Sequence, residues 1–102
     1  MKKQIHFSEL SRTDLKDIYL YIAIESPVRG RQLIVEIIQC CEQTLAKHPQ
    51  IGKIRPEIYI GLRSFVFKRY TIFYREAESA IEIIRILHGS RDVENALSRD
   101  AE

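Results

Sequence analysis

Four residues at the end of one apolar segment could take part in acid–base or phosphate chemistry. The segment "AIEIIRILHGSRD", residues 80–92, carries Arg85 among apolar residues and ends with His88, Arg91 and Asp92. Cleavage of RNA needs a proton acceptor for the 2′-hydroxyl, a proton donor for the leaving oxygen and a cation for the phosphorane. His88 could be the acid or the base, and the arginines could hold phosphate. A single histidine after a strand is more often a structural or surface residue, so this chemistry is one hypothesis among several.

No known catalytic or metal-binding motif accompanies these residues. The sequence has no HxH, HExxH, CxxC, phosphate-binding P-loop or GxSxG pattern. Cys40 and Cys41 are adjacent, and a disulfide between neighbouring residues is strained, so we expect two thiols on a helix with Cys41 in the core. The sequence therefore predicts neither a metal ion nor a cofactor.

The charges of the chain are unevenly distributed. Residues 44–75 include seven Lys and Arg residues and one acidic residue, Glu57, although the formal net charge of the whole chain is only +2. A basic middle third indicates an acidic partner, either protein or nucleic acid, or else a solvated face. Because alternation in a strand puts the basic and aromatic residues of this region on opposite faces, most of the aromatic residues belong in the core. We expect no sequence-specific nucleic-acid binding by the chain alone.

The first half of the chain is predicted to contain a strand and two helices. Residues 3–8 alternate as a short strand does. Ser11 is predicted to cap a helix that stops near Glu25, and Ser26 a second helix that ends at residues 48–49. The short link predicts an antiparallel hairpin. The second helix carries a wide apolar stripe, which is either all core or partly covered by a partner chain: Leu33, Ile34, Ile37, Ile38, Cys41 and Leu45.

The second half is predicted to form strands. Residues 49–61 look like a loop, in which Ile51, Ile54 and Ile58 plug the end of the core. A period of two predicts strands at 62–67 and 70–75, joined by a tight turn that lacks the usual Gly or Asn. After a turn at 77–79, the strand at 81–87 is apolar on both faces, which is typical of an interior strand.

This interior strand fixes the expected topology. Its free edge needs a neighbour, and the N-terminal strand is the only one to spare. The prediction is therefore one α+β domain over residues 1–102, of order β-α-α-β-β-β, with the helical hairpin packed on a mainly antiparallel four-stranded sheet. No apolar run approaches the ~20 residues that a membrane-spanning helix needs, and the first residues do not form a signal peptide, so we expect a cytoplasmic protein without a membrane partner.

Three stretches resemble toxins of the ParE branch of the RelE/ParE superfamily, from bacterial type II toxin–antitoxin systems. They are "DLKDIYLYIA" (14–23), "LRSFVFKRYTIFY" (62–74) and "EIIRILHGSRD" (82–92), of which the last is the most specific. The strand and helix order predicted above agrees with that family's fold. Many ParE-like sequences have Pro and Gly where this chain has Val66 and Lys68, so its hairpin departs from the family pattern there.

The resemblance implies a function. ParE-like toxins inhibit DNA gyrase and are not thought to be enzymes, whereas RelE-like relatives cleave mRNA on the ribosome. In the ribonuclease branch the third strand typically opens with Tyr-Arg-hydrophobic, but here it opens with Tyr70, Thr71 and Ile72. The missing arginine favours gyrase inhibition, with a ribosome-dependent mRNA endoribonuclease as the alternative.

The resemblance also implies partners and contact residues. The partners would be DNA gyrase and a cognate ParD-like antitoxin, which would wrap the toxin in a hetero-oligomer. The residues expected to bind the antitoxin are Ile34, Ile37, Ile38 and Cys41. Those expected to bind the target are Lys53, Arg55, Lys68, Arg69, His88 and Arg91. Arg85 would either pair with Asp14 or Asp17 or contribute to the target surface.

Overall fold

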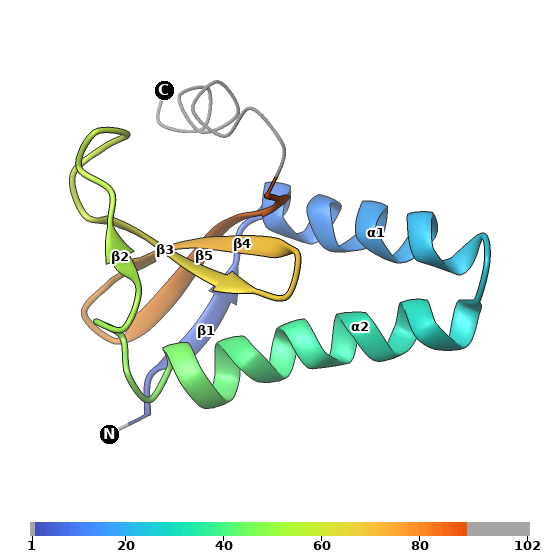
Figure 1. Ribbon diagram of the computed structural model, residues 1–102. Helices are drawn as coiled ribbons and strands as arrows, with labels where there is room; N and C mark the ends of the chain where they lie inside the picture. Colours follow the sequence, from blue (N-terminus) through green and yellow to red (C-terminus); the bar gives the residue numbers. More distant parts are fainter. Residues whose placement is uncertain (1, 90–102) are drawn as a thin grey trace.

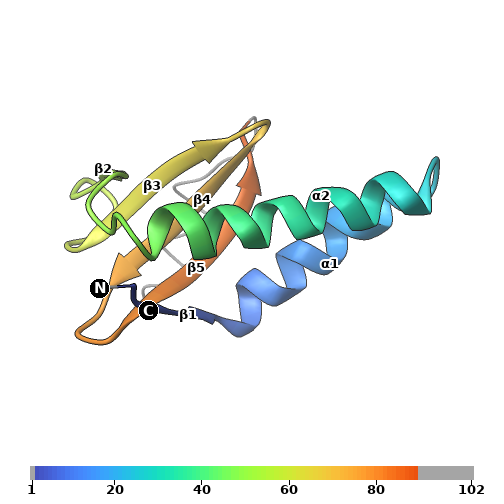
Figure 2. The ribbon, with the colours of Figure 1, turned by 90° about the horizontal axis from the view of Figure 1, so that it is seen from below.

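The chain folds into a helical hairpin packed on a five-stranded sheet. The computed structural model describes residues 2–89. Its elements in chain order are β1 (Gln4–Phe7), α1 (Glu9–Ala23), α2 (Pro27–Cys40), the π-helical η1 (Cys41–Leu45), β2 (Lys53–Ile54), β3 (Leu62–Phe67), β4 (Tyr70–Glu76) and β5 (Ala80–His88). The hairpin lies against the sheet and extends beyond its edge (Figures 1 and 2). No helix within residues 2–89 is long and apolar enough to cross a membrane.

The sheet confirms the predicted topology and adds a strand. The strand order is β1-β5-β4-β3-β2, so the N-terminal strand lies beside β5 as expected, and it runs parallel to it. The other pairs are antiparallel. The predicted number of four strands was wrong, because residues 53–54 of the expected loop pair with residues 63–64 of β3.

The N-cap residue was predicted correctly for the second helix but not for the first. Ser26 caps α2, with Pro27 in the first turn, as predicted. The first helix begins earlier than expected, because Ser8 and not Ser11 is its N-cap: the Ser8 hydroxyl oxygen accepts the backbone N–H of Ser11 at 3.0 Å. Ser11 is fully buried and its hydroxyl donates to the Ser8 carbonyl.

Side chains from both faces of the sheet are buried. The larger cluster joins η1 and the C-terminal half of α2 to the centre of the sheet and consists of Ile37, Cys40, Cys41, Leu45, Tyr70, Ile72, Tyr74, Ile81, Ile83 and Ile86. On the other face Leu62, Phe73 and Leu87 pack under Ile58 of the β2–β3 loop. Only Ile58 plugs the core as predicted; Ile51 and Ile54 are exposed, because this loop is held mainly by polar contacts.

Those polar contacts centre on Tyr74 and Gly52. The Tyr74 hydroxyl donates to the carbonyl of Pro49 and accepts the N–H of Gly52, both at 2.8 Å. Arg63 donates to the Gly52 carbonyl from the neighbouring strand, also at 2.8 Å. A short edge strand therefore forms where the sequence alone shows only a basic, proline-containing loop.

We expect Gly52→Ala to destabilise the fold by about 1–3 kcal/mol, as overpacking in a close-fitting site does. A Cβ at residue 52 would lie 2.5 Å from the Tyr74 hydroxyl oxygen and 2.9 Å from the Ser64 carbonyl oxygen. Thermal unfolding followed by circular dichroism measures the effect. Gly89→Ala is the control, since its Cβ would make only an ordinary 3.6 Å contact. Equal melting temperatures for the two variants would contradict the prediction.

Candidate functional site

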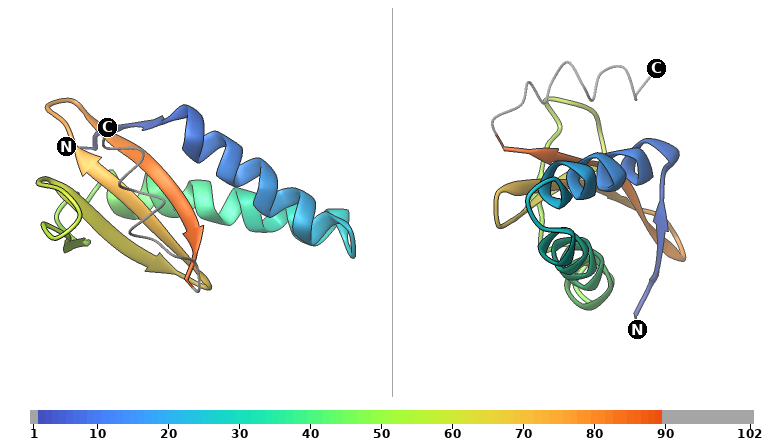
Figure 3. Two further views of the ribbon diagram at one scale, coloured as in Figure 1. Left: turned by 90° about the horizontal axis from the view of Figure 1, so that it is seen from above. Right: turned by 90° about the vertical axis from the view of Figure 1, so that its right-hand side faces the viewer.

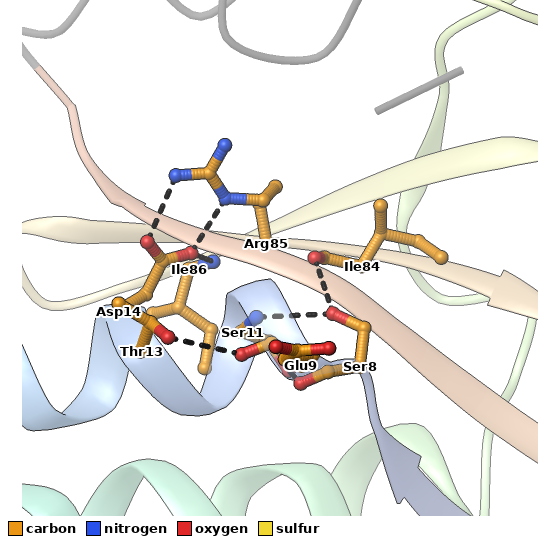
Figure 4. Close-up of polar contacts among 8 residues, drawn as sticks. All are labelled: Ser8, Glu9, Ser11, Thr13, Asp14, Ile84, Arg85 and Ile86. Atoms are coloured by element: carbon orange, nitrogen blue, oxygen red, sulfur yellow. Dashed lines mark hydrogen bonds and ion pairs between the residues drawn. The ribbon is translucent and has the colours of Figure 1, made fainter. Parts of the chain in front are cut away.

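Arg85 is held by α1, which answers why an apolar strand carries this charge. Its Nε donates to Asp14 Oδ2 at 2.8 Å and its second nitrogen to Asp14 Oδ1 at 2.9 Å (Figure 4). Both side chains are largely buried, at 14% and 9% exposed. Of the two carboxylates proposed from the sequence, Asp14 is the partner. The bidentate geometry is the strong form of the Arg–carboxylate contact.

The same part of α1 replaces a strand along the edge of β5. β1 pairs with β5 only as far as Ile83. Beyond that point, the Ser8 hydroxyl donates to the carbonyl of Ile84, and Asp14 Oδ2 accepts the N–H of Ile86 at 2.9 Å (Figure 4). A shift in the β4–β5 register beside Ile84 accompanies the change. These contacts fix the end of β5, and with it the position of His88.

A cleft of about 440 Å³, which we call the α1 cleft, lies next to this anchor. It is lined by Asp14, Asp17, Ile18, Tyr21, Arg69, Tyr70, Ile86, Leu87 and His88. The Tyr70 and His88 rings meet edge to face at 5.7 Å. Burial raises the pKa of Tyr70, so its hydroxyl stays protonated and able to donate a hydrogen bond at neutral pH. The cleft thus combines two tyrosines with an imidazole, a guanidinium and two carboxylates.

A second hollow of about 460 Å³, the α2 hollow, lies on the other side of Tyr70. It shares Arg69 and Tyr70 with the α1 cleft, and its remaining lining comes from Ile22, Arg29, Gln32, Leu33, Glu36 and Lys68. We call the two together the groove. Its lining comes from the helical hairpin, the β3–β4 turn and the ends of β4 and β5, and Figure 3 shows how the hairpin lies relative to the sheet. Lys68 closes one side of it, because its ammonium pairs with Glu36 and lies over the Phe67 ring at 5.7 Å.

Lys68 occupies a backbone conformation that favours glycine. Its φ of 56° is the only positive value at a non-glycine residue within residues 2–89. A lysine in this region of φ/ψ space is strained by roughly 1–2 kcal/mol. The turn that lacks Gly in the sequence therefore forms with strain, and the Glu36 contact helps to hold it.

The structure brings together only part of the predicted target-binding set. Lys68, Arg69 and His88 gather at one end of the sheet, where the β3–β4 turn meets the end of β5. Lys53 is exposed on β2, the strand at the far edge of the sheet. Arg91 lies outside the described residues.

Arg55 differs from the expectation of a freely solvated charge. Its Nε pairs with Glu57 at 2.6 Å, a second nitrogen donates to the Ser64 hydroxyl, and the guanidinium lies over the Phe73 ring. Arg55 lowers the pKa of the Glu57 carboxyl through this hydrogen bond. Arg55 is therefore part of the loop's own contacts, and its role at a target surface stays a prediction.

The predicted antitoxin stripe also needs correction. Ile37 and Cys41 are fully buried against the sheet, so they offer no surface to a partner. Ile34 and Ile38 are half-buried. Both cysteines are unbridged and lie on helices, as the sequence predicted. Burial raises the pKa of the Cys41 thiol to about 12. The stripe continues beyond α2 because η1 extends the helix over the core with Cys41 and Leu45 buried.

The groove residues that sequence reasoning missed include Tyr21, Arg29 and Glu36, and Asp17 was considered only as a partner for Arg85. All four lie on helices. Their position opposite the β3–β4 turn depends on the packing of the hairpin, which no local signal encodes. Among residues 2–89 no group of His, Cys, Asp and Glu side chains could hold a metal ion.

Comparison with known proteins identifies the family. Residues 5–93 match the family model described as the ParE toxin of the type II toxin–antitoxin system parDE. The chain belongs to the ParE toxin family. The curated relatives include the protein called Toxin ParE1 from two strains of Mycobacterium tuberculosis, each 38% identical over 53 residues. That match covers 51% of this chain and 54% of the relative, so the chain spans about half the length of the curated relatives it matches.

Solved structures share the fold. One is the chromosomal ParDE toxin–antitoxin system from P. aeruginosa, with a TM-score of 0.70 and 20% identity, covering 85% of this chain and 96% of the other. Another is the toxin–antitoxin complex RelBE2 from Mycobacterium tuberculosis, with a TM-score of 0.67 and 22% identity, covering 86% and 99%. These likenesses confirm the predicted α+β architecture.

Proposed function

We propose that this ParE-family toxin inhibits DNA gyrase as a protein inhibitor and is neutralised by a cognate ParD-like antitoxin. The observation that carries the proposal is the family match over residues 5–93, which includes every helix and strand described within residues 2–89 apart from the first residue of β1, Gln4. Two features support binding over catalysis. Thr71 stands where ribonuclease relatives carry arginine, and Arg85 is engaged by Asp14.

The experiment that tests the proposal is a supercoiling assay with purified gyrase. We expect the protein to inhibit supercoiling and to leave cleaved DNA, because a gyrase inhibitor of this kind traps the enzyme on its cut substrate. Heat-unfolded protein at the same concentration controls for nonspecific inhibition of gyrase by a basic polypeptide. Uninhibited gyrase together with cleavage of ribosome-bound mRNA would contradict the proposal.

The alternative is a ribosome-dependent mRNA endoribonuclease, and one arrangement favours it. His88, Arg69 and Tyr70 line the same cleft, which places a proton carrier, a cation and a hydroxyl near one another. Such a set can support cleavage of RNA by its 2′-hydroxyl. If the alternative holds, His88→Ala would abolish the cleavage of ribosome-bound mRNA while the fold persists.

The antitoxin is proposed to occupy the groove formed by the α1 cleft and the α2 hollow. Its lining mixes apolar and charged side chains and comes from the hairpin, the β3–β4 turn and the ends of β4 and β5. The half-buried Ile34 and Ile38 are still proposed to contact the antitoxin. An amphipathic segment in such a groove would bury apolar surface and cover the exposed arginine and histidine.

We expect the product of the adjacent antitoxin gene to raise the melting temperature of the toxin. A ligand at 100 times its dissociation constant stabilises a folded protein by about 2.7 kcal/mol, which is roughly 10–20 °C for a domain of this size. Differential scanning fluorimetry of toxin, antitoxin and mixture measures it. A mixture that melts as the sum of its separate parts would contradict the proposed partner.

A further inference from the structure

Four large apolar side chains are exposed at the far end of the helical hairpin. Leu20, Tyr21 and Ile24 come from α1 and its C-cap, and Val28 comes from the first turn of α2; they are 50%, 75%, 84% and 70% exposed. We call this surface the hairpin tip. The hairpin extends beyond the edge of the sheet, so none of the strands described within residues 2–89 reaches its far end (Figures 1 and 2).

The two helices already pack closely at this end without the tip side chains. Gly30 is buried, and a Cβ at this residue would lie 3.2 Å from the Tyr19 carbonyl oxygen and 3.3 Å from the backbone nitrogen of Ala23. The helical backbones therefore meet at Gly30, and the tip side chains lie outside this contact. Apolar side chains gathered on a projecting element are typical of a surface that another chain covers.

Two charges of opposite sign flank the hairpin tip. Glu25 lies three positions before Val28 and Arg31 three positions after it, and both are exposed. Neither forms an ion pair within residues 2–89. Asp17 and Arg29, which are also close in sequence, line the groove instead.

This arrangement of charges is self-complementary. In a two-fold symmetric contact each surface meets a copy of itself, so an acid on one side of the axis meets a base from the other side. With the axis at Val28, Glu25 of each copy lies opposite Arg31 of the other. A strongly acidic or basic partner would instead be matched by charges of a single sign.

We propose that the hairpin tip binds the hairpin tip of a second copy of this chain in a two-fold symmetric dimer. Ile24 and Val28 form its centre, and two Glu25–Arg31 ion pairs lie at its rim. Four side chains from each copy offer less than the roughly 800 Å² per partner of a standard interface, so the dimer is weak and reversible. The tip shares only Tyr21 with the groove, so the α2 hollow stays open in the dimer.

Sedimentation equilibrium of the purified, folded protein tests the proposal. Over about a 100-fold range of concentration we expect the mean mass to rise from that of one chain toward that of two, because the dimer population depends on concentration. Ile24→Glu places a charge at the centre of the contact and should lower the association constant at least about 10-fold. Its melting temperature should not change, since Ile24 is exposed. Ile60→Glu is the matched control, because Ile60 is 90% exposed away from the tip and its loss should leave the association unchanged.

Exchanging the two charges tests the register of the contact. Glu25→Arg and Arg31→Glu each put like charges opposite one another at both ion pairs, so each alone should weaken the association about 10-fold. The double variant Glu25→Arg/Arg31→Glu restores opposite charges and should recover the association. A wild type that stays monomeric, a mass that exceeds two chains, an Ile24→Glu variant that associates as well as Ile60→Glu, or a double variant that does not recover overturns the proposal. Gyrase inhibition is measured separately, so the proposed function can stand when this inference fails.

Discussion

Replacing Arg85 with alanine should lower the free energy of unfolding by about 3–5 kcal/mol, the usual cost of leaving one partner of a buried ion pair alone. The Asp14 carboxylate would remain largely buried with the backbone N–H of Ile86 as its polar partner from β5. In a domain of about 100 residues this corresponds to a melting temperature at least about 12 °C lower. Urea unfolding followed by circular dichroism measures the loss.

Two further variants keep this prediction testable if Arg85→Ala does not fold. Arg85→Lys retains the charge but loses the bidentate contact, so we expect an intermediate loss. Arg75→Ala is the matched control, because the Arg75–Glu82 pair lies on the same sheet but is 49% and 37% exposed. Such a surface pair contributes about 0–1 kcal/mol. If Arg85→Ala and Arg75→Ala unfold at the same urea concentration, Asp14 does not anchor β5 as we describe.

The same anchor shows what the sequence could and could not predict. An arginine inside an apolar strand demands a buried partner, and a carboxylate on the first helix was a sound inference. The contact of the Ser8 hydroxyl with the edge of β5 could not be predicted. Ser8 and Ser11 are both good helix caps, and only the position at which β1 ends decides which of them caps α1.

Among the strands and in the groove, features that the local sequence specifies could likewise be predicted, whereas features that depend on packing could not. Period-two segments specify β3 and β4 locally, and the structure has both strands and their two-residue turn where expected. β2 has two residues and no pattern of its own; it exists because Tyr74 and Arg63 hold residues 49–52. Likewise Arg29 and Arg69 are 40 positions apart and meet only through the packing of α2 against the turn.

Removing Arg69 and His88 together should weaken the inhibition of gyrase while the fold persists. Both side chains are exposed at the junction of the β3–β4 turn and the end of β5, and both line the α1 cleft. A few residues usually carry most of the binding energy at a protein interface, and arginine is common among them. We expect the concentration for half-inhibition to rise at least about 10-fold in Arg69→Ala/His88→Ala.

The control for this prediction is Arg31→Ala/Lys47→Ala, which removes two exposed cations away from the groove and should inhibit as well as the wild type. Loss of the contact between the His88 and Tyr70 rings costs about 0.5–1.5 kcal/mol, so the melting temperature of each variant is measured beside its activity. Growth after induced expression gives the same comparison in cells. Full inhibition by a well-folded Arg69→Ala/His88→Ala variant would place the target surface elsewhere. The exposed apolar end of the hairpin, where Tyr21, Ile24 and Val28 are 70–84% exposed, would then be the next surface to alter.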